Sequence, residues 1–171
     1  MLSKKLISEI SKSVISLATQ TNTTISVAES CTGGMVAEML TDVPGSSCCF
    51  SHGIVSYSNQ AKIKVLGVDP RLIENEGAVS EKVARSMAEG VLRICASDIS
   101  VAITGIAGPS GASEDKPIGT VCFAWCNKFT GEIQTSTKRH FFKGNRESIR
   151  MQAVEMALQG INQRMKILNS A

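Results

Sequence analysis

The sequence predicts an α/β protein, a three-layer α/β/α sandwich with a mixed sheet. Apolar, β-branched runs alternate along the chain with segments in which apolar residues recur at helical spacing. Two of those runs, 120–127 and 133–142, are separated by a turn at Lys128-Phe129-Thr130-Gly131, so they predict a hairpin and hence antiparallel pairing in the sheet. A length of 171 residues, without repeats or a linker, indicates a single domain over 1–171.

The first half of the chain begins with an amphipathic helix. Leu2, Leu6, Ile10, Val14 and Leu17 are spaced as on one helical face. The elements expected next are a strand at 24–28, a helix from about Gly33 to Leu40 that Asp42-Val43-Pro44-Gly45 ends, a strand at 48–57, a helix at 59–66 that ends at Gly67, and a short helical turn from Asp69-Pro70 to Gly77.

The second half continues the alternation. Ser80 is a suitable N-cap for a helix through about Ala96, with Glu81 favourable in its first turn. The elements expected after it are a buried strand at 98–104, a glycine-rich loop at 105–119, the hairpin, and a final helix from Asn145 to about Leu168.

Composition excludes several classes of protein. Hydrophobic residues make up 43% of the chain and charged residues 19%, which is typical of a soluble globular protein. The net charge is only +3, aromatic residues are 4%, and Lys138-Arg139-His140 is the one basic cluster, so we expect no nucleic-acid partner. No apolar run approaches the ~18 residues needed to span a bilayer, which predicts a cytoplasmic protein without a membrane contact.

The six cysteines follow neither a disulfide nor a zinc pattern. Cys48-Cys49 are adjacent, while Cys122 and Cys126 lie in an apolar strand pattern. His52 and His140 are isolated from them in the sequence. We therefore expect reduced, mostly buried thiols, with no metal and no cofactor.

The segment 28–34 places chemistry at a strand-to-helix turn. Ser30 and Cys31 stand side by side there, each a candidate nucleophile. Thr32, Gly33 and Gly34 follow, and the unpaired amides of a helix start can hold an anion or a developing oxyanion. The residues alone leave the choice between the hydroxyl and the thiol open, because a thiol at a helix start can have a lowered pKa.

A base for this nucleophile is expected in the segment 56–62. A serine hydroxyl needs a general base at neutral pH, and neither histidine lies in a catalytic pattern. Tyr57, the only tyrosine, ends a strand, and Lys62 lies in the first turns of the next helix. A partly desolvated lysine can act as a base, and the tyrosine hydroxyl can relay the proton or hold the lysine. The alternative is a surface lysine and a capping tyrosine.

Two further segments are candidates for binding an anionic group. Thr104, Gly105 and Gly108 belong to a glycine-rich loop that follows a buried strand, where ligands of α/β sheets gather. The loop is neither a P-loop nor a dinucleotide fingerprint. Arg146 opens the last helix, and a guanidinium beside a helix start suits phosphate or carboxylate. The alternatives are a flexible connection and a solvated arginine.

Taken together, these segments resemble the C-terminal domain of the competence/damage-inducible protein CinA, the nicotinamide-nucleotide amidase family. The resemblance covers nearly the whole chain, in the family's order. The matching segments are Ala-Glu-Ser-Cys-Thr-Gly-Gly (28–34), Leu-Thr-Asp-Val-Pro-Gly-Ser-Ser (40–47), Tyr-Ser-Asn-Gln-Ala-Lys (57–62), Gly-Ala-Val-Ser (77–80), Thr-Gly-Ile-Ala-Gly-Pro (104–109), Lys-Pro-Ile-Gly-Thr-Val (116–121) and Gly-Asn-Arg (144–146). The departures are Asn145, where the family commonly has aspartate, and Gly111-Ala112-Ser113, where a second glycine is usual.

The resemblance implies hydrolysis of the carboxamide of nicotinamide mononucleotide, in pyridine nucleotide recycling. It implies Ser30 as the nucleophile, assisted by Lys62 and Tyr57, and a phosphoribosyl group held around Thr104, the following glycines and Arg146. It implies no metal. Because the chain begins directly at this domain, the resemblance also implies a stand-alone form. We expect a homo-oligomer whose partner is a small pyridine nucleotide.

Two alternatives stay open at this point. Cys31 is the rival nucleophile within the same class of enzyme. A non-catalytic nucleotide-binding module or regulatory subunit would keep the glycine-rich loop and Arg146 without needing a base near Ser30. A thiol redox protein is disfavoured, because the chain has no Cys-x-x-Cys pair.

Overall fold

The computed structural model of the chain describes residues 4–129 and 131–168. In this part of the chain the strands are β1 (Ile25–Glu29), β2 (Phe50–Val55), β3 (Ile99–Gly105), β4 (Thr120–Asn127) and β5 (Gln134–Phe141). The α-helices are α1 (Lys4–Gln20), α2 (Met35–Thr41), α3 (Asn59–Leu66), α4 (Pro70–Glu76), α5 (Glu81–Cys95) and α6 (Arg146–Leu168), and a short 3-10 helix covers Ser46–Cys48.

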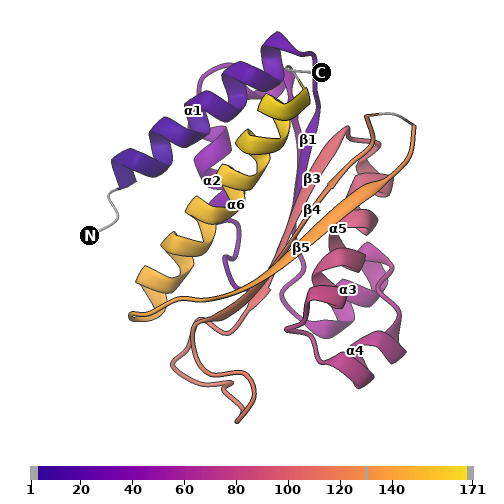
Figure 1. Cartoon of the computed structure of the whole chain (residues 1–171), viewed down its shortest axis with the longest axis vertical. Helices are drawn as coiled ribbons and strands as arrows, with labels where there is room; N and C mark the ends of the chain where they lie inside the picture. The colour runs from indigo at the N-terminus through magenta and orange to yellow at the C-terminus, as the bar shows by residue number, and fades with distance from the viewer. Residues whose placement is uncertain (1–3, 130, 169–171) are drawn as a thin grey trace.

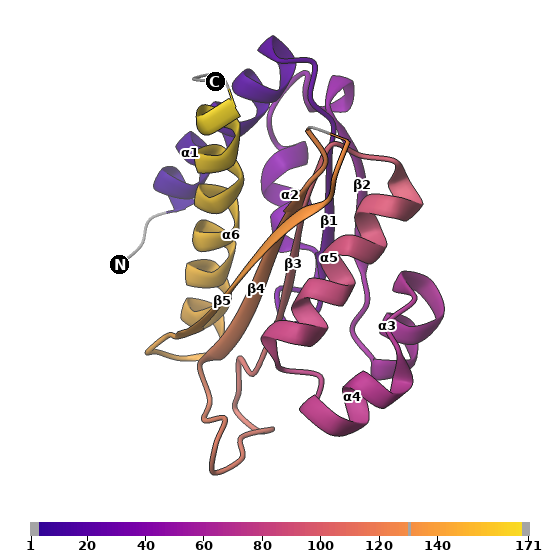
Figure 2. The same cartoon turned by 45° about the vertical axis from the view of Figure 1, so that its right-hand side comes forward.

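The strands form one mixed sheet in the order β2-β1-β3-β4-β5. β1 pairs in parallel with β2 and β3, whereas β4 is antiparallel to both β3 and β5. Helices α1, α2 and α6 cover one face of the sheet and α3, α4 and α5 cover the other (Figures 1 and 2). The predicted α/β/α sandwich with a mixed sheet and a β4–β5 hairpin is therefore confirmed.

The two faces of the central strands differ in the size of their side chains. Toward α1, α2 and α6 the sheet contributes Val27, Val101, Ile103, Val121, Phe123 and Trp125. Toward α5 it contributes Ala28, Ala102, Cys122, Ala124 and Cys126. Burial on both faces explains why these strands read as continuous apolar runs, and the small residues let α5 pack close to the sheet.

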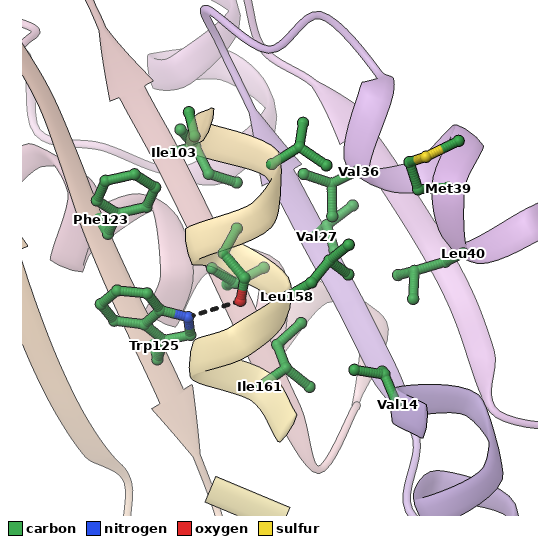
Figure 3. Packing of buried hydrophobic residues seen from close by; sticks show 14 of the residues in the cluster. Val14, Val27, Val36, Met39, Leu40, Ile103, Phe123, Trp125, Leu158 and Ile161 are labelled. Atoms are coloured by element: carbon green, nitrogen blue, oxygen red, sulfur yellow. Dashed lines mark hydrogen bonds between the residues drawn. The ribbon is translucent and has the colours of Figure 1, made fainter. Parts of the chain in front are cut away.

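Trp125 and Gly160 show how closely α6 approaches the larger face. The indole ring stacks on Phe123 with centroids 5.4 Å apart, and its Nε1–H donates to the Ala157 carbonyl at 3.0 Å (Figure 3). A Cβ on Gly160 would lie 2.2 Å from that ring. Glycine is thus required there, and this turn of α6 packs directly on β4. No helix in the described residues is long and apolar enough to cross a membrane.

Several predicted boundaries differ from the structure by one or two residues, and two element starts differ for a clear local reason. The strand expected from Cys48 begins at Phe50, because Gly45 adopts a left-handed conformation and a 3-10 turn with a Cys48 N–H to Gly45 carbonyl bond precedes it. The helix expected from about Gly33 begins at Met35, because Gly33 (φ 60°) and Gly34 (φ 96°) are both left-handed. The two glycines therefore belong to the turn, and their left-handed conformations let the chain change direction sharply between β1 and α2.

The parallel strands end at one edge of the sheet, where the chemistry-bearing segments meet. β1, β2 and β3 all end there, so the turns that follow Glu29, Val55 and Gly105 are neighbours. β4 begins and β5 ends at the same edge, and α6 starts a few residues later. The fold thus brings together segments that are more than 100 residues apart in the sequence.

Candidate active site

Ser30 and Lys62 form a buried polar pair at this edge of the sheet. The Lys62 Nζ lies 3.0 Å from the Ser30 Oγ. Ser30 is 7% exposed and Lys62 only 1%, which makes this lysine the largest fully buried side chain among the described residues. A lysine is rarely so buried without an acidic partner. The surface-lysine alternative is therefore excluded, and the pair has the geometry of a nucleophile and its base.

Helix α3 places Lys62 by its caps and its packing. The Ser58 side chain caps the helix by accepting from the Ala61 N–H at 3.0 Å, and Gly67 ends it in a left-handed conformation. Gly90 of α5 lets the end of α3 approach closely, since a Cβ there would lie 2.1 Å from the Leu66 carbonyl oxygen. The lysine side chain consequently runs from a short, well-anchored helix into the interior.

The surroundings of Lys62 favour its neutral form. Its Nζ contacts the carbonyl oxygens of Ser56 at 3.0 Å and Tyr57 at 3.3 Å in addition to the Ser30 Oγ. Burial lowers the pKa of Lys62, and no acidic side chain of the described residues is within ion-pair distance of its Nζ. The three oxygen neighbours can accept from the three N–H groups of an ammonium, and they equally fit a neutral amine with two N–H groups for the carbonyls and one lone pair for the serine proton.

The start of α2 is already occupied by a carboxylate. The fully buried Glu29 side chain accepts from the N–H groups of Gly34 at 3.0 Å, Val36 at 3.2 Å and Ala37 at 2.9 Å. The Gly33 N–H donates to the Ser30 carbonyl at 3.0 Å. These amides are therefore not available to a ligand, whereas the sequence predicted that the amides of this helix start would hold an anion or an oxyanion. Within the described turn, the Cys31 amide interacts with its own thiol, and neither this amide nor that of Thr32 donates to another residue.

Cys31 is a poor candidate for the nucleophile. Burial raises the pKa of its thiol to about 12, so the sulfur is protonated at neutral pH. Thr32 is also buried, and its Oγ1 has no hydrogen-bond partner. Cys31 lines the cavity described next, whereas Thr32, Gly33 and Gly34 do not. The structure thus favours the hydroxyl of Ser30 over the neighbouring thiol.

A cavity of about 280 Å³ opens over the Ser30–Lys62 pair. The predicted site residues that line it are Ser30, Cys31, Tyr57, Lys62, Thr104, Gly105, Gly108 and Arg146. The residues that line it and were not singled out from the sequence are Asn59, Ala78, Val79, Ile106, Ala107, Ser110 and Gly111. Several of these residues belong to the segments 77–80 and 104–109, which carry the family resemblance. The sequence therefore marked these segments, but it gave their individual residues no role.

Arg146 and Tyr57 meet across this cavity. The guanidinium donates to the Gly108 carbonyl at 2.6 Å and to the Tyr57 hydroxyl at 3.2 Å. Tyr57 is 59% exposed, and its backbone carbonyl, not its hydroxyl, is the group that contacts Lys62. The expected proton relay through the phenol is therefore not the arrangement in this structure, in which the phenol links the segment between β2 and α3 to the start of α6.

Thr104 also has a local structural partner. Its hydroxyl donates to the Ala78 carbonyl at 2.9 Å, which holds the segment before α5 against the end of β3. A Cβ on Gly105 would lie 2.8 Å from Val121, so glycine is needed for the chain to turn away from β4. Both residues shape the wall of the cavity.

Other parts of the described chain lack this combination of groups. A larger cavity of about 400 Å³, between β5 and the end of α6, is lined by Arg164, amide side chains and the hydroxyls of Thr135 and Ser136, but by no lysine or histidine that could act as their base. Neither His52 nor His140 lines the Ser30 cavity. The described residues contain no group of three or more His, Cys, Asp or Glu side chains that could hold a metal ion. The Ser30 cavity is therefore the candidate active site.

The fold and the site together define an α/β protein with a buried serine–lysine pair at the end of a mixed sheet. The sequence matches the CinA C-terminal domain over residues 7–165. The chain therefore belongs to the CinA C-terminal domain family.

Relatives and solved structures agree with this assignment. The chain is 49% identical over 154 residues to a CinA-like protein of Chlorobaculum tepidum, covering 90% of this chain and 36% of that protein. It thus spans about a third of the length of such relatives. It is 42% identical over 158 residues to the nicotinamide-nucleotide amidohydrolase PncC of Enterobacter agglomerans, covering 92% of this chain and 94% of that protein. The crystal structure of the competence damage-inducible protein A of Klebsiella pneumoniae superimposes with a TM-score of 0.88 at 34% identity, covering 94% and 97% of the two chains.

Proposed function

We propose that this protein is an amidohydrolase that converts nicotinamide mononucleotide to nicotinic acid mononucleotide and ammonia through a Ser30 acyl-enzyme. The observation that carries the proposal is the 3.0 Å contact between the Ser30 Oγ and the Nζ of a fully buried lysine. The relative named nicotinamide-nucleotide amidohydrolase, matched over nearly its whole length, supports the substrate class.

The first half of the reaction forms the acyl-enzyme. Neutral Lys62 takes the Ser30 proton while the Oγ attacks the carboxamide carbon. The amide of Cys31, the residue of this turn that lines the cavity beside Ser30, stabilises the negative oxygen of the tetrahedral intermediate. When the intermediate collapses, the C–N bond breaks and the Lys62 ammonium gives its proton to the departing nitrogen, which leaves as ammonia.

The second half uses the same groups on water. Lys62, neutral again, takes a proton from a water molecule that attacks the ester carbon. The C–O bond to Ser30 breaks, the serine oxygen regains its proton from Lys62, and the product leaves as a carboxylic acid. Atoms and protons balance over the cycle without a metal or an organic cofactor, so the proposed cycle uses only side chains of this chain and water.

Recognition of the nucleotide is assigned to the other end of the cavity. Arg146 carries a positive charge at the start of α6, beside the glycine-rich segment that contains Gly105 and Gly108. A guanidinium can bind a phosphate in a bidentate manner. Tyr57, held by Arg146, lies at the same rim and offers an aromatic face to the pyridine ring.

The test is ammonia release from nicotinamide mononucleotide, compared with nicotinamide riboside and free nicotinamide. Hydrolysis of the nucleotide alone is the expected result, because only the nucleotide carries the phosphate for Arg146. Binding of the nucleotide without ammonia release would contradict the proposal and support a nucleotide-binding module. A cytoplasmic location, a homo-oligomeric state and a single domain over 1–171 stay predictions.

A further inference from the structure

We propose that Glu29 and Arg150 are positioning residues that hold the catalytic turn 30–34 from two sides and thereby keep Ser30 and the Cys31 amide in place for the reaction. Neither residue lines the cavity, so neither touches the substrate. The inference rests on the proposed function, because it concerns the same serine and the same turn.

Glu29 holds the turn from the sheet side. Its carboxylate takes three amides of the turn and of α2, as described above, and so neutralises the positive end of that helix. Its backbone carbonyl accepts from the Ser56 N–H at 2.8 Å, and the Ser56 carbonyl in turn contacts the Lys62 Nζ at 3.0 Å. One residue thus connects the nucleophile's turn to the segment that holds the base.

Arg150 holds the turn from the side of α6. Its Nη2 donates to the Thr32 carbonyl at 2.7 Å. A Cβ on Gly33 would lie 3.2 Å from the same nitrogen, so the guanidinium packs directly against the turn. The Arg150 Nε is buried without a hydrogen-bond partner, and no acidic side chain of the described residues is within ion-pair distance of it.

Keeping such an arginine half-buried is costly, because a cation and an unpaired N–H both lose water. A helix of this protein could bury an apolar side chain there more cheaply. The charge lies near enough to affect the Cys31 thiol, since Arg150 and Lys62 lower its pKa while Glu29 raises it, although burial dominates. Glu29 and Arg150 therefore flank the oxyanion turn with opposite charges, and each bonds to the turn's main chain.

The geometry has a direct consequence for how the active site works. With the amides of Gly33, Gly34, Val36 and Ala37 already bonded, α2 offers the substrate no free helix start. Loss of either Glu29 or Arg150 would leave the turn free to shift, and a misplacement of about 1 Å costs a reaction on the order of 100-fold. Binding of the phosphate, at Arg146, would be unaffected.

The experiment compares Glu29→Gln, Arg150→Met and Arg150→Lys with the parent chain in two assays. The first is steady-state hydrolysis of nicotinamide mononucleotide. The second is the rate at which a fluorophosphonate labels Ser30, read by mass spectrometry, which needs the turn but not the nucleotide. We expect kcat and the labelling rate to fall about 10- to 100-fold in Glu29→Gln and Arg150→Met, with KM within about twofold. Arg150→Lys, which keeps one donor for the Thr32 carbonyl, should recover part of both rates.

Matched controls separate positioning from stability. Arg164→Met removes another half-buried arginine of α6 that donates to a main-chain carbonyl, that of Gly160 at 2.9 Å. Asp98→Asn weakens a carboxylate that accepts the Thr24 N–H at 2.8 Å at the opposite edge of the sheet. Both should lower the melting temperature while leaving kcat and labelling at parental values.

The possible outcomes distinguish the positioning role of Glu29 and Arg150 from the proposed function. Parental kcat and parental labelling in the Glu29 and Arg150 variants would overturn the positioning role. In another outcome, the parent chain is labelled at Ser30 but does not hydrolyse the nucleotide, and labelling falls in the Glu29 and Arg150 variants. That result would support the positioning role and contradict the proposed function. A parent chain in which Ser30 reacts with neither reagent would overturn both.

Discussion

The starts of α2 and α6 lie at the same edge of the sheet, but only the start of α2 already binds a negatively charged side chain. At α2 the helix start is filled from within by the buried Glu29 carboxylate. At α6 the cap is the neutral Asn145, whose Oδ1 accepts from the Ser148 N–H at 2.9 Å, and Arg146 faces the cavity. In sequence both segments are typical of an anion site.

The difference teaches that a helix start alone does not identify a binding site. Its amides bind whatever acceptor the fold supplies first, and in α2 the preceding residue supplies one. The two ends of the cavity accordingly have separate tasks in the proposed reaction. The α2 end carries the chemistry of Ser30 and Lys62, and the α6 end carries recognition by Arg146 and Tyr57. The predictions below test that separation.

Ser30→Ala should have the largest effect, at the chemical end. Removal of the nucleophile should lower kcat about 10⁴-fold or more, because no other group in the turn is a thiolate or an activated hydroxyl at neutral pH. Cys31→Ala is the control, and it should keep ammonia release within a few-fold of the parent. The opposite ranking of these two variants, measured by ammonia release, would assign the nucleophile to the thiol.

Lys62→Met should lower kcat about 10³-fold while raising the stability of the fold. Burial disfavours the ammonium form of Lys62 in the folded chain, whereas the unfolded chain keeps it protonated in water. This difference lowers the free energy of unfolding of the parent chain at neutral pH, and methionine does not carry that penalty. The thermal unfolding midpoint at neutral pH should therefore rise in the variant. An unchanged kcat would exclude Lys62 as the base.

The lowered pKa of Lys62 also predicts two pH dependences. Because the neutral amine is the base, kcat/KM should rise with pH as folded Lys62 loses its proton. Between that lowered pKa and the model-compound value of 10.5, the unfolded chain binds more protons than the folded one, so the free energy of unfolding should rise with pH. Denaturant titrations across that interval should show the slope in the parent chain and its loss in Lys62→Met.

Arg146→Met tests the recognition end. Loss of a charge-assisted contact to phosphate costs about 1.5–3 kcal/mol, so kcat/KM for the nucleotide should fall roughly 10- to 150-fold, mainly through KM. Any slow turnover of the riboside, which lacks the phosphate, should be unchanged. An equal loss for both substrates would show that Arg146 serves the chemistry and would break the separation of the two ends.

Tyr57→Phe should have the smallest effect. The phenol hydroxyl holds Arg146 and does not contact Lys62, so its removal should change kcat/KM by about 5-fold, the size of a single hydrogen bond of about 1 kcal/mol. The comparison is with Lys62→Met in the same ammonia assay. A larger loss in Tyr57→Phe than in the lysine variant would make the tyrosine the principal base.

Much of the fold was predictable because the signals are local. The alternation of strand and helix patterns, the hairpin after Asn127, the helix end at Gly67 and the cap at Ser80 depend on neighbouring residues, and the structure confirms them. The strand start expected at Cys48 was wrong because Gly45 begins a 3-10 turn. The residue types at 46–48 do not by themselves distinguish a 3-10 turn from an extended strand.

The individual site residues were predicted less completely. Ser30, Lys62 and Arg146 were singled out because each lies in a distinctive segment, and the structure brings all three to one cavity; their roles stay predictions. Arg150 and the buried role of Glu29 were missed, since one looks like an ordinary residue of a helix and the other like the end of a strand. Their roles depend on partners such as Thr32, which is 118 positions from Arg150.

By itself, the sequence determined the class of fold, the family and the short list of reactive side chains, because those follow from local pattern and residue chemistry. Only the tertiary structure decided which of them act together. It buried Lys62 against Ser30, protonated Cys31 by enclosing it, turned the Tyr57 hydroxyl toward Arg146, and filled the start of α2 with Glu29. Burial and distance set pKa values and hydrogen-bond partners, and both arise only when segments far apart in the sequence pack together.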